Sequence, residues 1–384
     1  MTDAAEARLT VDLDALGANF GRLQATAPTA EVAPVVKANA YGLGAGPVAR
    51  RLWAQGARSF FVAREAEGEQ LRRELGPERP ARIYVLDGLP RGTAIRLATA
   101  GLTPVLNSPA QVEEAAAFAR AARRPLEAAL HIDTGLNRLG LRPEEARALA
   151  EAPDRLKGLE LVLVMSHLAC APDPGHPMNR AQLERFEAVS AMFPGVRRSL
   201  ANSGGIFLGP EFHFDLVRPG ITLYGGGPRE RHDPRISAVA CLDAPIVQVR
   251  TVPPGESVGY DATFTARAPT QVAIILAGHA DGYLRQGAGR AQVWFEGAMR
   301  PVLGSVSMDL LAVDVTGCRT AAPGARVEVL GPHALVDEVA AASGTISYEV
   351  LVRIGERALR AYAGALAGEH AAGDGRQHRA GHGG

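Results

Sequence analysis

The sequence predicts a (β/α)8 barrel followed by a second, mainly β domain. In the first part of the chain, eight short apolar runs alternate with helical patterns over about 220 residues, which is the count for this barrel. After about residue 235 the helical periodicity fades, and short β-like runs separated by Gly, Pro and Asp replace it. A doubly wound open sheet is the alternative for the first part, because strand order cannot be read from the sequence.

The length agrees with two domains, since 384 residues exceed one ordinary domain. We place the barrel at residues 1–233 and the β domain at 234–366. Residues 367–384 are mostly Gly, Ala, His, Arg and other polar types, and such a segment cannot bury enough surface to order itself. We therefore expect a disordered tail there.

Each element is assigned from its local pattern. The barrel strands are predicted at 34–37, 59–63, 82–86, 103–106, 128–132, 159–166, 198–202 and 214–218. In the second domain we expect strands at 246–252, 271–276, 291–295, 310–315 and 327–330. Among the helices, one carries an apolar stripe over 48–53. Another should begin at Ser108 as N-cap, with Pro109 at the first position and Gln111 completing a capping box.

Composition excludes several classes of partner. Lys+Arg and Asp+Glu both number 41, so no long-range field attracts nucleic acid or an anionic membrane. The apolar runs are far shorter than the ~20 residues of a membrane span. The N-terminus lacks the basic and apolar regions of a signal peptide. Cys170, Cys241 and Cys318 have no CxxC spacing, which indicates reduced thiols and no metal site. A cytoplasmic protein is expected.

Lys37 is the most informative candidate for chemistry. It directly follows the apolar run Ala-Pro-Val-Val, and catalytic residues of this barrel lie at the carboxyl ends of strands. Desolvation in an apolar mouth lowers the pKa of an ammonium group, and the free amine can attack an aldehyde to form a Schiff base. The alternative is a solvated lysine just beyond a strand. The segment after Lys37 should bend tightly and bring Tyr41 near whatever Lys37 holds.

Two later loops predict a phosphate site. The loops after barrel strands 7 and 8 often bind phosphate, and here they contain Asn202-Ser203-Gly204-Gly205 and Arg218-Pro219-Gly220-Ile221. Small residues let backbone N–H groups approach an anion, and Ser203 adds a hydroxyl donor. Two ordinary glycine turns are the alternative. One lysine together with one phosphate cradle fits pyridoxal 5'-phosphate (PLP).

These segments, with others in the same order, resemble the alanine racemase family. The lysine segment 35–44, VVKANAYGLG, is similar to the PLP-lysine signature of that family. The further segments that match it are DTGLNRLG at 133–140, SHLAC at 166–170, ANSGG at 201–205, RPGITLYG at 218–225, GESVGY at 255–260, ADG at 280–282, SMD at 307–309 and TISYE at 345–349. The resemblance spans nearly the whole chain.

The resemblance implies a role for each matching residue. Lys37 resembles the Schiff-base lysine, Tyr260 the second catalytic base, Arg218 the arginine that faces the pyridine nitrogen, and His167 the histidine beside the ring. The phosphate contacts correspond to Tyr41, Ser203, Gly220, Ile221 and Tyr348, with Asn202 also among the cofactor-binding residues. Arg138, Met308 and Asp309 resemble the residues that bind the substrate carboxylate.

The implied activity is two-base racemisation of alanine, with Lys37 and Tyr260 on opposite faces of the substrate. In the family, Tyr260 and Met308 act on the cofactor of the other subunit, so the resemblance implies a homodimer with shared active sites. D-alanine for peptidoglycan is the implied product. The chain departs from the family pattern at His131, where many members have lysine, and at Ser305 and His279.

Two alternatives stay open. A broad-specificity amino-acid racemase of the same fold would have the same motifs, because the size of the side-chain pocket is invisible in the sequence. A non-enzymatic PLP-binding homeostasis protein would resemble the barrel alone. The roughly 130 residues after the barrel and the segment around Tyr260 favour a racemase.

Overall fold

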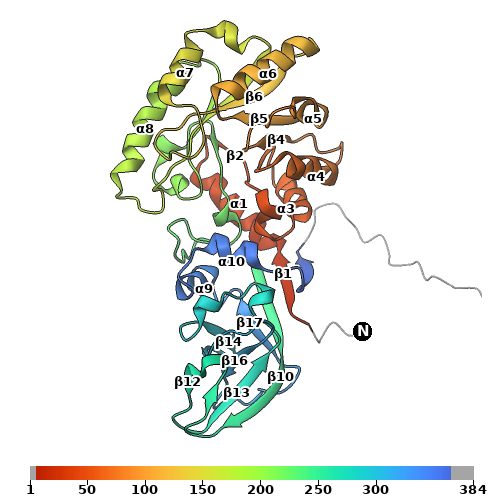
Figure 1. Cartoon of the computed structure of the whole chain (residues 1–384), viewed down its shortest axis with the longest axis vertical. Coiled ribbons are helices and arrows are strands. Elements are labelled where there is room, and N and C mark those ends of the chain that lie inside the picture. Colours follow the sequence, from red (N-terminus) through yellow and green to blue (C-terminus); the bar gives the residue numbers. More distant parts are fainter. Residues whose placement is uncertain (1–5, 365–384) are drawn as a thin grey trace, which may run out of the picture.

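The computed structural model describes residues 6–364 and consists of a helix-rich part and a β-rich part (Figure 1). The first surrounds a parallel sheet, and the second contains most of the C-terminal strands. The predicted disordered tail at 367–384 lies outside the described residues. Among residues 6–364, no helix is both long enough and apolar enough to cross a bilayer.

Eight parallel strands close into a barrel. Six of them form one sheet in the order β3-β4-β5-β6-β7-β8, and β2 pairs with β9 in parallel. The bridges Val35↔Phe61 and Asn202↔Arg218 connect these two sheets at both edges, so the circuit is complete. A closed circuit of eight strands confirms the predicted (β/α)8 barrel and excludes the doubly wound open sheet.

Seven of the eight predicted barrel strands overlap strands of the structure, whereas the first, predicted at 34–37, is wrong because the observed strand ends at Val32. The strands are β2 (Glu31–Val32), β3 (Ser59–Val62), β4 (Arg82–Val85), β5 (Leu102–Leu106), β6 (Leu126–His131), β7 (Leu159–Met165), β8 (Arg197–Ser199) and β9 (Leu216–Val217). The first strand therefore ends before 34–37, the range expected for it. Lys37 begins a short helix instead of ending a strand.

Helices cover the outside of the barrel (Figure 1). They are α1 (Leu13–Thr26), α3 (Ala45–Ala54), α4 (Glu65–Leu75), α5 (Ala94–Thr99), α6 (Pro109–Ala122), α7 (Pro143–Ala150) and α8 (Pro177–Ser190). The short element α2 (Lys37–Tyr41) instead contributes residues to a cavity of the barrel. Short 3-10 helices lie at η2 (Pro153–Leu156), η3 (Gly205–Phe207), η4 (Pro210–Phe212) and η5 (Ile221–Leu223).

The start of α6 follows the predicted chemistry with one difference. Ser108 is the N-cap, and its side chain accepts a hydrogen bond from the backbone N–H of Gln111 at 3.3 Å. The Gln111 side chain accepts from the N–H of Asn107 at 2.8 Å and not from that of Ser108. The capping box is therefore wrong in its second half, because Gln111 reaches one residue further back. In α3 the predicted apolar stripe faces the core, with Val48 and Leu52 fully buried.

The second part is a mostly antiparallel sheet that closes on itself. Its order is β13-β16-β15-β14-β17-β10-β1-β18, where β1 is Arg8–Asp12, and β13 also pairs with β10. The strands are β10 (Ala240–Val252), β13 (Thr270–Ile275), β14 (Gln292–Phe295), β15 (Ala298–Leu303), β16 (Leu311–Asp314), β17 (Arg326–Leu330), β18 (Leu359–Ala363) and the small hairpin β11 (Ser257–Val258) and β12 (Phe264–Thr265). All five strands predicted in this part are present, which confirms a mainly β domain.

Short helices complete the second part. They are α9 (Val336–Ala342), α10 (Ser347–Arg353), η6 (Tyr260–Ala262), η7 (His279–Asp281) and η8 (Arg285–Gly287). In Figure 1, α10 lies at the junction between the two parts. There α10 contacts α2, the short element that begins with Lys37.

The N-terminal strand β1 (Arg8–Asp12) belongs to the second sheet, which the sequence did not indicate. It pairs antiparallel with β10 and parallel with β18. Leu9 and Val11 on this strand are fully buried, and they belong to a core cluster that contains residues of both parts. The chain thus passes from the second sheet into the barrel through α1, and the domain boundary at residue 233 stays a prediction.

Candidate active site

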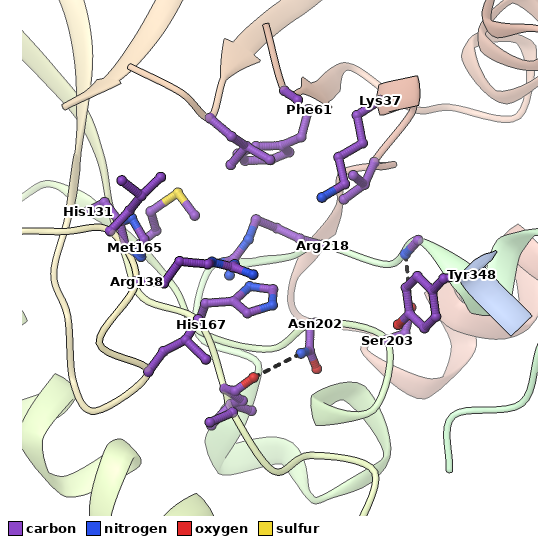
Figure 2. Close-up of a pocket in the computed structure, with 18 of the residues that line it drawn as sticks. Lys37, Phe61, His131, Arg138, Met165, His167, Asn202, Ser203, Arg218 and Tyr348 are labelled. Atoms are coloured by element: carbon purple, nitrogen blue, oxygen red, sulfur yellow. Dashed lines mark hydrogen bonds between the residues drawn. The ribbon is translucent and has the colours of Figure 1, made fainter. Parts of the chain in front are cut away.

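A cavity of about 570 Å³ opens at the carboxyl ends of the barrel strands (Figure 2). The residues that follow β4, β7 and β9, respectively Asp87, His167 and Arg218, all line it. In the view of Figure 2, Ser203 and Tyr348 lie together on one side, and His131 and Arg138 lie on the other. The Lys37 side chain points between these two groups. The cavity therefore has a hydroxyl-rich end and a cationic end.

The backbone after Lys37 forms a left-handed turn. Ala38, Asn39, Ala40 and Tyr41 have φ of 51°, 55°, 54° and 56°. L-residues pay about 1–2 kcal/mol each for this conformation, so the surrounding contacts must hold it. The turn reverses the chain within a few residues. It places both the Lys37 and the Tyr41 side chains at the cavity.

Glu67 on α4 is one of the contacts that hold this turn. Its Oε1 accepts a hydrogen bond from the N–H of Ala38 at 2.8 Å, and its Oε2 accepts one from Ala63 at 2.8 Å. The Asn39 side chain accepts from the N–H of Ala45, also at 2.8 Å. One carboxylate therefore ties the turn that carries Lys37 to the end of β3, and charge-assisted bonds of this kind are among the stronger ones.

The Lys37 amine lies in an environment that favours its neutral form. Burial lowers its pKa below the ordinary 10.5, and the positive charge of Arg138 lowers it further. Glu67 and Asp87 act in the opposite direction. The net shift is downward, in the direction expected for a lysine in a barrel mouth, and it makes the amine a better nucleophile and base at neutral pH.

The hydroxyl-rich end is built by the loops after β8 and β9. Ser203 is 3% exposed, and its Oγ accepts a hydrogen bond from the N–H of Gly220 at 2.9 Å and one from Thr222 Oγ1 at 3.2 Å. Among the described residues 6–364 its own hydroxyl proton has no acceptor, so it can be donated to a ligand. Gly220 has no room for a side chain, because a Cβ there would overlap the Tyr41 hydroxyl. The glycine thus lets Tyr41 reach this end of the cavity.

Three tyrosine rings cluster beside Ser203. The Tyr41 ring centroid lies 4.8 Å from that of Tyr224 and 5.8 Å from that of Tyr348. Burial raises the pKa of Tyr41 well above its usual value and that of Tyr348 to about 12. Both phenols therefore stay protonated and can donate to an anion. The Tyr224 hydroxyl donates to the carbonyl of Val35 at 2.8 Å, which fixes the segment before Lys37.

Arg218 forms the floor of the cavity. It is 3% exposed, and its Nη groups donate to the Ser199 hydroxyl and the Ser166 carbonyl. Its Nε–H has no acceptor within residues 6–364, so that donor remains for a ligand. Burial lowers the pKa of Arg218 to about 9, which still leaves it protonated at neutral pH.

Two histidines near Arg218 are held neutral. Burial first and then Arg218 lower the pKa of His167 well below its usual range and that of His131 to about 4. The Asn107 amide N–H₂ donates to the carbonyls of Leu86 and Val105, so its Oδ1 faces His131 Nδ1 at 2.7 Å. Nδ1 of His131 therefore carries the proton. Nε2 is left as an acceptor.

The conformation of the loop that carries Arg138 accounts for the sequence of that loop, DTGLNRLG at 133–140. Asp133 Oδ1 accepts from the N–H groups of Gly135 at 2.9 Å and Asn137 at 3.1 Å. Gly140 has φ of 111°, and a Cβ there would lie 2.8 Å from the Asp133 nitrogen. The loop is thus a compact turn, closed by an aspartate and a glycine, that points Arg138 at the cavity (Figure 2).

The structure brings together most, but not all, of the predicted site residues. Those that line the cavity are Lys37, Tyr41, Arg138, His167, Asn202, Ser203, Arg218, Gly220 and Tyr348. Ile221 is buried directly after Gly220. Tyr260, Met308 and Asp309 come from the second part and are not among the residues that line this cavity. Tyr260 is 66% exposed and Met308 58%.

Several residues that shape the site were not predicted. Phe61 and Met165 line the cavity, and Phe61 stacks on Tyr84 with centroids 4.6 Å apart. Phe61 and Met165 lie on predicted strands, but they could be assigned to the cavity only once it is known which face of each strand points inward. The sequence contains only a weak indication for Glu67. An acid in the first turn of a helix commonly accepts hydrogen bonds from nearby backbone N–H groups, but this does not identify the distant turn after Lys37.

Comparisons with known proteins cover nearly the whole described chain. A sequence model of the alanine racemase N-terminal domain matches residues 11–228, and one of the C-terminal domain matches residues 239–362. The chain belongs to the alanine racemase family. This membership confirms the family and the enzyme class predicted from the sequence, a PLP-dependent racemase, and with it the cofactor.

Individual relatives agree along their full length. An alanine racemase of Methylobacterium sp. (strain 4-46) is 47% identical over 93% of this chain and 97% of its own. A catabolic alanine racemase of Agrobacterium fabrum is 44% identical over 93% of this chain and 92% of its own. The crystal structure of alanine racemase from Bartonella henselae, with covalently bound pyridoxal phosphate, superposes with a TM-score of 0.88. It is 38% identical and covers 94% of this chain and 100% of its own.

The cavity of this racemase-family chain fits PLP. The hydroxyl-rich end offers Tyr41, Tyr348 and Ser203 as protonated donors to a phosphate dianion. Lys37 supplies a primary amine of lowered pKa, and Arg218 supplies a buried cationic donor between the two ends. Gly220 keeps the phosphate end open where any other residue would overlap Tyr41. The donor set therefore matches an aldehyde, a ring nitrogen and a phosphate.

Proposed function

We propose that this chain interconverts L-alanine and D-alanine, with PLP bound through Lys37. The observation that carries the proposal is the cavity itself, in which an amine of lowered pKa faces a hydroxyl-rich phosphate end. Tyr41, Ser203, Gly220, Ile221 and Tyr348 would hold the phosphate. Asn202 and His167 would lie along the ring, and Arg218 at its nitrogen.

Racemisation requires a proton to leave one face of the α-carbon and another to arrive at the opposite face. Bound PLP supplies an electron sink that makes the α-proton more acidic. Lys37 serves one face, because its lowered pKa allows it to accept and return a proton near neutral pH. We assign the other face to Tyr260 of the partner subunit, since Tyr260 of the same chain does not line the cavity.

Arg218 favours racemisation over other PLP reactions. A protonated arginine donates a hydrogen bond to the ring nitrogen but does not transfer its proton at neutral pH. A ring held by Arg218 would be a weaker electron sink than a protonated ring paired with a carboxylate. Arg218 at this position would therefore disfavour the misplaced protonation that leads to transamination.

We assign the substrate carboxylate to the cationic end of the cavity. Arg138 lies there, and its guanidinium can bind a carboxylate with two parallel hydrogen bonds. Met308 and Asp309 of the partner subunit would close this end. In this chain the Asp309 side chain accepts a hydrogen bond from Arg357 at 2.7 Å, which holds the loop in place.

A homodimer with shared active sites would account for exposed apolar side chains in both parts of the chain. Tyr260 is 66% exposed, Met308 58%, Leu139 44% and Ile346 41%. Leu139 and Ile346 line the cavity, whereas Tyr260 and Met308 do not. A second copy that inserts its Tyr260 and Met308 at Leu139 and Ile346 would bury all four at once. The same arrangement would supply the missing base.

The proposed role is to supply D-alanine for peptidoglycan. Relatives named catabolic alanine racemases make alanine breakdown the competing role. A deletion strain that needs D-alanine to grow supports the first, and one that only fails to grow on alanine supports the second. A cytoplasmic location is proposed from the three cysteines, all of which are free thiols.

The activity is tested by incubating the purified chain and PLP with L-alanine or, separately, with D-alanine, and measuring the other enantiomer. We expect conversion in both directions, with a loss of about 10³-fold in the Lys37→Ala variant. L-serine tested in parallel separates an alanine racemase from a broad-specificity racemase. PLP binding without any racemisation would leave the PLP-binding homeostasis protein as the better description.

A further inference from the structure

A buried carboxylate in the second part of the chain contacts the loop that leads out of the phosphate end. Asp337, on α9, is 4% exposed, and its Oδ2 accepts a hydrogen bond from the N–H of Gly227 at 2.8 Å. Gly227 follows η5, the short helix that begins at Ile221. The bond therefore joins α9 to the segment immediately after the predicted phosphate-binding residues.

The second oxygen of the same carboxylate fixes the start of α10. The Ser347 hydroxyl donates to Asp337 Oδ1, and Ser347 is 2% exposed. Ser347 directly precedes Tyr348, whose ring lines the cavity (Figure 2). One side chain thus connects the barrel loop, α9 and the residue next to Tyr348.

The barrel loop is shaped to allow this close approach. A Cβ at Gly227 would lie 3.2 Å from Asp337 Oδ2 and would overlap the Arg231 carbonyl. A Cβ at Gly226 would lie 3.2 Å from Ser347 Cβ and would overlap Ile221. Two consecutive glycines therefore let α10 pack directly against the loop. Side chains at these positions would push Tyr348 away from Ser203 and Tyr41.

We propose that Asp337 is a positioning residue for cofactor binding, which holds Tyr348 against the phosphate end of the cavity. The inference rests on the proposed function, because it requires the phosphate of PLP at that end. Asp337 does not itself line the cavity and acts through Ser347 and Gly227.

The charge of Asp337 has a second effect in the same direction. Burial raises the pKa of Tyr348 to about 12, and the negative charges of Glu230 and Asp337 add to this shift. The phenol is thereby kept as a hydrogen-bond donor. A donor is what a phosphate dianion requires.

The test is a double-mutant cycle on the affinity for PLP. The full chain is stripped of cofactor, and PLP is titrated back while the absorbance of the bound form is followed. We expect Asp337→Ala and Tyr348→Phe each to weaken PLP binding about tenfold, the value of one hydrogen bond to a charged group. If Asp337 acts through Tyr348, the double variant should have the same affinity for PLP as whichever single variant binds PLP less tightly.

Further variants separate positioning from a general loss of stability. Ser347→Ala keeps the Asp337–Gly227 bond and should still weaken PLP binding, so it replaces Asp337→Ala if that variant does not fold. Asp243→Ala removes a carboxylate that pairs with Arg8 and Arg326 in the second sheet, away from the cavity. It should lower the melting temperature without changing the affinity for PLP.

The outcomes are distinguishable. Losses that multiply in the double variant, or PLP affinity within about twofold of the wild type in both Asp337→Ala and Ser347→Ala, would overturn the positioning role. A wild-type chain that binds no PLP at all would overturn the proposed function as well.

Discussion

At the scale of single residues, Lys37 lies between charges of opposite sign. Arg138 lowers its pKa, whereas Glu67 and Asp87 raise it, and burial dominates both. These charges belong to different segments, so each can be removed separately. Their effects on the amine can then be read from the pH dependence of PLP capture, a step that does not require substrate.

We predict that the Arg138→Gln and Asp87→Asn variants shift this pH dependence in opposite directions. The neutral amine reacts, so the rate rises as pH approaches the pKa of Lys37. Removing Arg138 should raise that pKa and move the rising part of the pH–rate curve to higher pH. Removing Asp87 should lower the pKa of Lys37 and move the rising part of the curve to lower pH. Stopped-flow absorbance measures the rate, and shifts of equal sign would contradict this electrostatic account.

Nine residues that line the cavity were predicted from the sequence. Some of them, such as Arg218, directly follow an apolar run that forms a strand, whereas others, such as Arg138 and Tyr348, were indicated only by the family resemblance. The bond of Asp337 to Gly227 could not be predicted, because the two residues are 110 positions apart and nothing in the local sequence distinguishes Asp337 from a solvated acid. For Glu67, its place in the first turn of α4 indicated a bond to the nearby backbone, such as that to Ala63, but not the bond to Ala38, 29 positions away. Only the folded chain identifies their partners.

At the scale of elements, the left-handed turn after Lys37 is the feature least accessible to sequence reasoning. A tight bend was expected there, but Ala38-Asn39-Ala40 has no run of glycine to indicate four consecutive residues of positive φ. The strand β1 was missed for a different reason. Its partner β10 begins more than two hundred residues later, and five residues of alternating burial carry a weak signal.

We predict that Gly42→Ala destabilises the protein more than Gly317→Ala does. Both glycines have positive φ, +85° and +79°, so both substitutions pay about 1–2 kcal/mol for the backbone. A Cβ at Gly42 would in addition lie 2.8 Å from the Leu351 carbonyl of α10, whereas one at Gly317 meets nothing within 4 Å. Differential scanning calorimetry should therefore show a larger fall in melting temperature for Gly42→Ala.

The contact between Gly42 and α10 also bears on the site. If α10 is pushed away, Tyr348 moves with it, and Gly42→Ala should weaken PLP binding while Gly317→Ala should not. Equal melting temperatures and equal PLP affinities for the two variants would show that α10 does not depend on this approach.

At the scale of the whole molecule, the shared site predicts complementation between two inactive variants. Lys37→Ala and Tyr260→Phe chains, unfolded together and refolded as a 1:1 mixture, form mixed dimers in half of the cases. Each mixed dimer has one site with both bases intact. Random pairing therefore gives roughly a quarter of the wild-type activity. A mixture no more active than its components would contradict a site built from two subunits.

The central claim is that Lys37 in this cavity holds PLP and that the assembled site racemises alanine. The most direct measurement is an absorbance spectrum of the purified protein before and after borohydride, with the modified peptide located by mass spectrometry. The account predicts a visible band that borohydride abolishes, with the label on Lys37, in a protein that makes D-alanine before reduction and none after it. A colourless protein that PLP cannot reconstitute, or a label on another lysine, would contradict it.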